Sequence, residues 1–181
     1  HYGMDNNYIF QYWDAIENGT VTVGKWIRTI YKILVDGLKS GKWDFDEGKA
    51  NKAINFIENF CHHSEGLNFL LKLELWQKAI VSAIFGIMDK KTGYRQFREV
   101  FIVVARKNGK TLFAAAIAAY MTYIDGEYGA KVYFLAPKLD QAELVYDAFY
   151  QIVQADDELD SITKKRRSDI YIKEFNTSVK K

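Results

Sequence analysis

The chain has 181 residues, of which 49% are hydrophobic, 27% charged and 15% aromatic. This composition excludes intrinsic disorder and suits one domain, or one domain with a small appendage. A net charge of +2 is weaker than the basic excess of most dedicated duplex-binding domains, and the single cysteine excludes an intramolecular disulfide,. The longest apolar stretch, Leu112 to Ile124, is shorter than the roughly 20 residues that a membrane-spanning helix needs, so we expect no membrane association,.

The first sixty residues predict three helices, because apolar residues recur at helical spacing over 8–16, 26–34 and 50–60,. Asn18-Gly19 would end the first as a C-cap. Residues 1–64 are therefore expected to form a small helical N-terminal subdomain. The cluster at 61–63 (Cys-His-His) has too few ligands for a structural zinc site, which needs about four, and we interpret it as part of a linker,.

From Leu73 onward the pattern changes to alternating helices and strands. A wide apolar helical face over 75–87 and a turn at 90–93 precede two short buried strands and their following helices,. The expected ranges are a strand at 100–105, a helix at 111–124, a strand at 132–136, a helix at 139–153 and a weaker strand at 170–175. This order predicts an α/β fold with a parallel sheet and crossover helices.

The first strand and its helix enclose a candidate phosphate-binding loop. Gly109-Lys110-Thr111 match the end of the P-loop pattern Gly-x4-Gly-Lys-Ser/Thr, whereas Val104 stands at the first glycine position,. Three matched positions alone are a weak signal, but a buried strand before them and an apolar helix after them are the context that a P-loop requires. Residues 65–181 are accordingly predicted to be a P-loop ATPase core.

Each matched residue type suits ATP and Mg²⁺. Backbone N–H groups at a helix N-terminus favour phosphate, and Gly109 lets the backbone approach it closely. Lys110 would place its ammonium near the β- and γ-phosphate oxygens, and the Thr111 hydroxyl would bind Mg²⁺. The alternative interpretation is a simple strand-to-helix turn with exposed basic residues.

Two further cations, Arg106 and Lys107, precede Asn108 in the same loop. Arg106 is a candidate catalytic residue beside Lys110, because an arginine near the γ-phosphate stabilises transition-state charge. A solvated arginine, or one paired with a carboxylate such as Glu99, is the alternative, and the sequence favours neither.

The segment Ala-Arg-Lys-Asn-Gly-Lys-Thr at 105–111 strongly resembles the ATPase of tailed-phage large terminase subunits, whose variant Walker A motif has an early arginine and lacks the usual first glycine. The blocks at 73–77, 84–86 and 136–142 are similar in order and spacing, as are 24–26 and 43–46 near the N-terminus. The resemblance implies that Gln77 contacts adenine. A partly buried glutamine that caps a helix is the alternative.

The resemblance also implies a viral DNA-packaging motor that couples ATP hydrolysis to DNA translocation into the capsid. The implied partners are double-stranded viral DNA, a small terminase subunit, the portal ring and further copies of the chain. The implied full-length protein carries a C-terminal metal-dependent nuclease and works in the host cytoplasm.

One element of the family pattern is missing from the sequence. No apolar strand ending in Asp-Glu follows the P-loop, so the core is interpreted as truncated before Walker B and the fragment as inactive alone. Two other classes stay open: a helicase-like or other P-loop ATPase, and a non-catalytic nucleic-acid-binding module using the basic run at 164–167.

Overall fold

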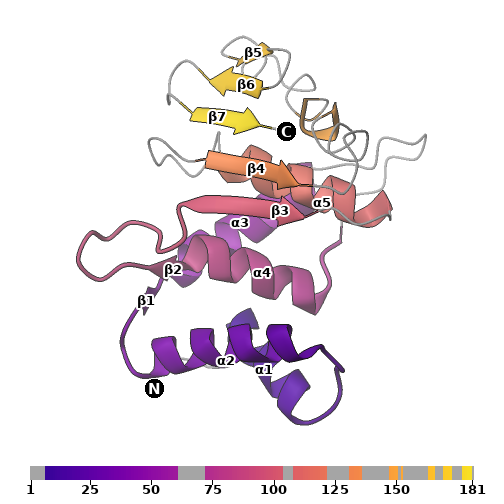
Figure 1. The fold of residues 1–181 in the computed structure, drawn as a ribbon. Coiled ribbons are helices and arrows are strands. Elements are labelled where there is room, and N and C mark those ends of the chain that lie inside the picture. Colours follow the sequence, from indigo (N-terminus) through magenta and orange to yellow (C-terminus); the bar gives the residue numbers. More distant parts are fainter. Residues whose placement is uncertain are drawn as a thin grey trace. The chain divides into compact units, whose positions relative to one another are not determined.

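A computed structural model of the chain describes residues 7–60, 72–103, 108–121, 131–135, 147–150, 152, 163–165, 169–172 and 177–180 (Figure 1). The chain divides into two compact units. Unit 1 comprises residues 1–55 and 72–97, and unit 2 comprises residues 56–71 and 98–181. Since this division interleaves the chain, the predicted domain boundary at residue 64 stays a prediction.

Unit 1 is built mainly from helices. They are α1 (Tyr8–Glu17), α2 (Lys25–Lys39), the first part of α3 (Glu47–Phe60), and α4 (Leu75–Gly86). The Asn7 side chain caps α1 by accepting from the backbone N–H of Ile9 at 2.9 Å, and Gly19 follows the helix at φ +80°,. The helices predicted within the first sixty residues are thus confirmed.

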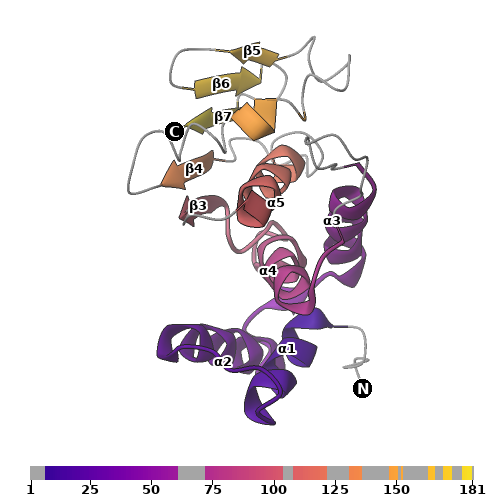
Figure 2. The same cartoon turned by 90° about the vertical axis from the view of Figure 1, so that its right-hand side faces the viewer.

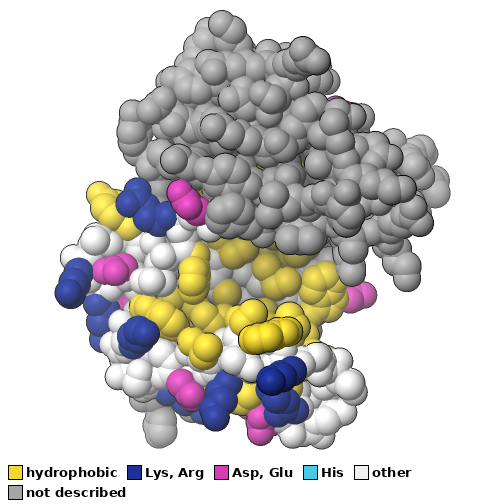
Figure 3. Space-filling model, viewed as in Figure 1, with side chains coloured by type: hydrophobic (Ala, Val, Ile, Leu, Met, Phe, Trp, Pro, Cys, Tyr) yellow, Lys and Arg dark blue, Asp and Glu magenta, His cyan; other side chains and the backbone are white. Residues whose placement is uncertain are grey.

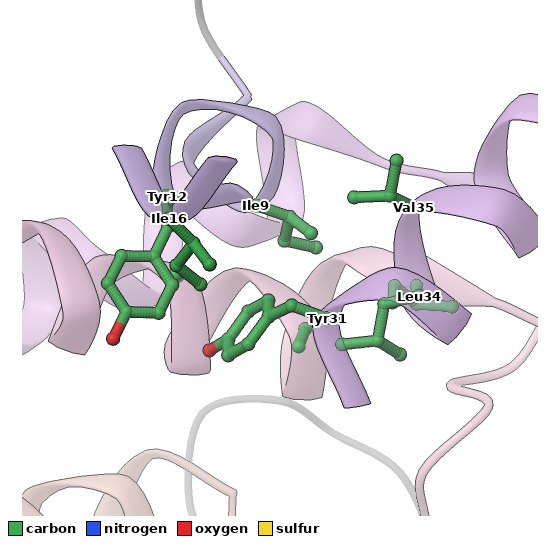
Figure 4. Packing of buried hydrophobic residues seen from close by; sticks show 9 residues of the cluster. Ile9, Tyr12, Ile16, Tyr31, Leu34 and Val35 are labelled. Atoms are coloured by element: carbon green, nitrogen blue, oxygen red, sulfur yellow. The ribbon is translucent and has the colours of Figure 1, made fainter. Parts of the chain in front are cut away.

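The core of unit 1 lies where α1 packs against α2 and α4. Figure 4 shows the side chains of Ile9, Tyr12 and Ile16 from α1 facing those of Tyr31 and Leu34 from α2. The two tyrosine rings meet edge to face, with centroids 4.9 Å apart,. Burial, and to a smaller extent the neighbouring Tyr12, raise the pKa of the Tyr31 phenol above its ordinary value.

A two-stranded antiparallel sheet, which the sequence did not predict, joins two distant segments of unit 1. β1 (Asp44–Phe45) pairs with β2 (Ile87–Met88). The Phe45 ring lies so close to Gly86 that a Cβ there would come within 2.5 Å of it. The backbone N–H of Asp46 also donates to the Gly86 carbonyl at 2.8 Å. The absence of a side chain at residue 86 therefore permits the end of α4 to pack against this sheet.

The turn predicted at 90–93 is present and is organised by Asp89. Its Oδ1 atom accepts from the backbone N–H groups of Lys91 at 2.7 Å and Thr92 at 3.0 Å. These backbone hydrogen bonds lower the pKa of the Asp89 carboxyl, and the one from Thr92 has the largest effect. Gly93 then takes the left-handed conformation at φ +72°,.

Unit 2 contains the sheet. Its strands are β3 (Glu99–Val103), β4 (Lys131–Leu135), β5 (Thr163–Lys165), β6 (Asp169–Ile172) and β7 (Thr177–Lys180), in the order β3-β4-β7-β6-β5. β3 and β4 are parallel, as predicted, and so are β4 and β7. The antiparallel pairs β5–β6 and β6–β7 make the sheet mixed, which corrects the expectation of a purely parallel one. Short connections between these strands allow antiparallel pairing without a crossover helix.

Helix α5 (Asn108–Ala119) connects β3 toward β4 and lies along one face of these strands (Figures 1 and 2). Every residue from Phe113 to Met121 is buried. The helix begins three residues earlier than predicted, so Gly109 lies inside its first turn. The Gly109 N–H group is one of the leading groups that have no intrahelical acceptor.

Replacing Ile9, which is 0% exposed, by alanine should lower the free energy of unfolding by about 2–5 kcal/mol, since it leaves a cavity,. The matched control is Ile33→Ala in α2, where the side chain is 54% exposed and the change should stay within about 0.5 kcal/mol,. Urea unfolding followed by circular dichroism measures both. Equal losses would contradict the assignment of Ile9 to the core.

Candidate functional site

The candidate phosphate site is centred on the start of α5, which four residues of the chain separate from the end of β3. Asn108, Gly109, Lys110 and Thr111 form the first turn of this helix, so the structure brings these four predicted residues together. No acidic residue lies in that turn. Arg106 and Lys107 lie outside the described residues.

The backbone alone gives the first turn of α5 its chemical character. The leading N–H groups of an α-helix lack intrahelical acceptors and carry the positive end of the helix dipole. Phosphate oxygens are suitable acceptors for these groups. The missing carboxylate matters, because a carboxylate in the first turn would compete with an incoming anion for the same N–H groups.

Burial of the helix body holds the first turn of α5 in place, and the strand that precedes it in the chain is paired in the sheet. β3 is paired to β4 over five residues, and α5 is enclosed along Phe113 to Met121. A helix that is apolar all round is stable only when it is surrounded by other parts of the protein. The first turn of α5 therefore belongs to a helix whose body is held in place by burial.

Gln77, the predicted adenine contact, belongs to unit 1 and lies in the first turn of α4. It is 8% exposed, and its Oε1 atom accepts from the backbone N–H of Glu74 at 2.8 Å. Glu74 and Gln77 together form a capping box,. Gln77 therefore caps α4, which is the alternative interpretation given for this glutamine above.

The glutamate of this capping box has a second contact. Trp76 donates from its indole Nε1 to Oε2 of Glu74 at 2.6 Å. The sequence pattern indicated a role for Gln77 alone, and the contacts that join Glu74 to Trp76 and Gln77 were not predicted. The signal was present, because a hydrogen-bonding side chain at the N-cap with glutamine three residues later is the spacing of a capping box,.

The described residues contain no group of three or more His, Cys, Asp or Glu side chains that could hold a metal ion. The Cys61-His62-His63 cluster falls outside them. None of the helices in the described part of the chain combines the length and hydrophobicity needed to cross a bilayer.

Comparison with known proteins identifies the family of this arrangement. The family model described as the terminase large subunit, ATPase domain, matches residues 75–180, which is more than half of the chain. The chain belongs to this family. The matched region contains α4 and all the candidate nucleotide-binding residues, so the terminase resemblance seen in the sequence is confirmed.

A solved structure supports the same fold for this terminase ATPase domain. The crystal structure of the HK97 bacteriophage large terminase is similar to it with a TM-score of 0.54 and 23% sequence identity. The similarity covers 73% of this chain and 26% of that one, so the chain corresponds to about a quarter of the HK97 protein. A search of curated proteins gave no match.

Gln77→Ala should lower the free energy of unfolding by about 0.5–2 kcal/mol, the usual cost of removing a helix-capping side chain. Gln77→Glu is the matched control, since a carboxylate oxygen still accepts from the Glu74 N–H. Thermal unfolding measures both variants. If Gln77→Glu is destabilised as much as Gln77→Ala, the capping oxygen is not what stabilises α4.

Proposed function

We propose that this terminase ATPase domain is the ATP-binding part of a viral DNA-packaging motor. It has a P-loop core that binds ATP and Mg²⁺, and hydrolysis drives double-stranded DNA into the capsid. The observation that carries the proposal is the position of Gly109-Lys110-Thr111 in the first turn of a buried helix that follows a parallel strand in the chain.

The proposed roles follow from the chemistry of each residue. The N–H groups of the α5 first turn bind the β-phosphate, and the Lys110 ammonium neutralises the β- and γ-oxygens. The Thr111 hydroxyl is the protein ligand of Mg²⁺, whose charge polarises the terminal phosphate. Asn108 and Lys107 extend the loop around the phosphates, and Arg106 stabilises negative charge on the γ-phosphate during transfer.

The larger assembly is part of the proposal. It comprises viral duplex DNA, a small terminase subunit, the portal ring and further copies of the chain, working in the host cytoplasm. The family match favours this function over a helicase-like ATPase or a non-catalytic nucleic-acid-binding module, because the matched family is the terminase ATPase. A helical subdomain over 1–64 and a core over 65–181 remain the proposed domain division.

Lys110→Ala should weaken binding of ATP with Mg²⁺ by at least about tenfold, because loss of one charged contact to phosphate costs about 1.5–3 kcal/mol. Isothermal titration calorimetry at millimolar nucleotide measures it. Lys49→Ala, at an exposed position in α3, is the control and should bind as the unmodified chain does. Equal affinities for the Lys110 variant and the unmodified chain would exclude this lysine from the site.

Gln77→Ala should reduce the preference for ATP over GTP. The glutamine amide can donate to adenine N7 and accept from N6, and the alanine side chain can do neither. Competition between the two nucleotides for the same protein measures the preference. An unchanged preference in this variant would leave Gln77 with a structural role only.

A further inference from the structure

Helix α2 has two apolar faces, and unit 1 needs only one of them. Tyr31, Leu34 and Val35 are buried against α1 and α4. A second set points to solvent: Trp26 is 74% exposed, Ile30 49% and Ile33 54%. These three residues stand at positions i, i+4 and i+7, so they lie along one side of the helix. We call this set the outer stripe.

The residues of the outer stripe are neighbours on the surface and not scattered single apolar residues. In Figure 3 hydrophobic side chains gather on the face of the molecule that carries α2 and α4, with Lys and Arg side chains along the margin. Single exposed apolar residues are ordinary, but contiguous ones mark interaction sites, and tryptophan is the most frequent anchor of such sites. A stable dimer buries about 800 Å² of surface on each partner. Three side chains on one helix offer less area than that, so the outer stripe suits a single helical segment as its partner.

The charges beside the outer stripe indicate what kind of helical segment would bind there. The Lys25 Nζ atom lies 5.8 Å from the centroid of the Trp26 ring, and Lys32 follows two turns later on the same flank. Arg28 is already paired with Glu17 at 2.9 Å. Asp36 is the one acidic residue of α2, and it stands four residues after Lys32, on the same flank but toward the C-terminal end of the helix,.

The start of α2 adds to this positive character. Its first turn has no acidic residue, and the N-cap Gly24 makes no side-chain hydrogen bond. Lys25 thus stands where the helix dipole favours an anion,. A carboxylate brought to this end of the stripe would meet both the dipole and the lysine. A second copy of α2 would instead bring another cationic helix.

We propose that the outer stripe binds an acidic amphipathic helix of a partner protein. The apolar face of that helix covers Trp26, Ile30 and Ile33, and its carboxylates lie beside Lys25 and Lys32. This interaction shares no residue with the proposed nucleotide site.

Two designed peptides of about 20 residues test the proposal on the 181-residue chain,. Both carry the same leucine face at i, i+4 and i+7. One has glutamates and the other lysines on either side of that face. Fluorescence anisotropy of labelled peptide gives each affinity. The glutamate peptide should bind at least about tenfold tighter than the lysine peptide, a difference equivalent to one close charge contact.

Three variants locate the binding. Trp26→Ser combined with Ile33→Ser should lose at least about tenfold in affinity for the glutamate peptide. Tyr94→Ser, which removes an aromatic side chain that is 56% exposed elsewhere in unit 1, is the control and should bind normally. Lys25→Glu combined with Lys32→Glu should reverse the preference in favour of the lysine peptide.

Several results would overturn the proposal. They are equal binding of the two peptides, unchanged binding by the Trp26/Ile33 variant, and no binding of either peptide at millimolar concentration. Anionic phosphatidylglycerol vesicles are a further probe. If the chain binds them through Trp26 but ignores the glutamate peptide, the stripe recognises a lipid surface and not a protein helix.

Discussion

A helix enclosed by other parts of a protein can leave backbone hydrogen-bonding groups without intrahelical partners only at its ends. This constraint governs α5. Because residues 113–121 are buried, the helix cannot shift or fray along its body without exposing a dense apolar surface,. Its N–H groups with no intrahelical acceptor therefore stay at Asn108 to Thr111,. Lys110 and Thr111 fall in this same turn because they are consecutive in the sequence.

The sequence allowed the helices to be predicted well, because burial on one face imposes a period that residue types reveal. α1, α2, α3 and α4 all occur where apolar spacing indicated them. β3 and β4 were equally visible, since a strand buried on both faces is an unbroken apolar run. β1 and β2 could not be predicted, because each has two residues and exists only through its pairing with the other. β5 and β7 were not predicted, for a related reason. Their residues are largely polar, and neighbouring strands rather than local preference determine them.

For the candidate site, the sequence was informative where chemistry is tied to a strict spacing. The Gly-Lys-Thr triplet after an apolar strand led to the start of α5, and the structure places these residues in one turn. The exact first residue of that helix was not predictable, since glycine and asparagine are poor helix formers and a helix start is usually expected after them. The outer stripe shows the opposite limit. Periodicity identified α2 as amphipathic, but only the packing of α1 and α4 reveals which of its apolar residues remain uncovered.

The capping box at the start of α4 has a consequence for molecular recognition. A glutamine side chain in solution samples many rotamers, and ordering it on a ligand carries an entropic penalty. Here the Glu74 backbone already holds the Gln77 oxygen, so the orientation of the amide is fixed before any nucleotide arrives. A carbonyl oxygen has a second lone pair, so capping the helix does not exhaust its capacity to accept. Under the proposed function, the same hydrogen bond that completes a helix end would preorganise Gln77 for its contact with adenine, at little additional loss of conformational freedom.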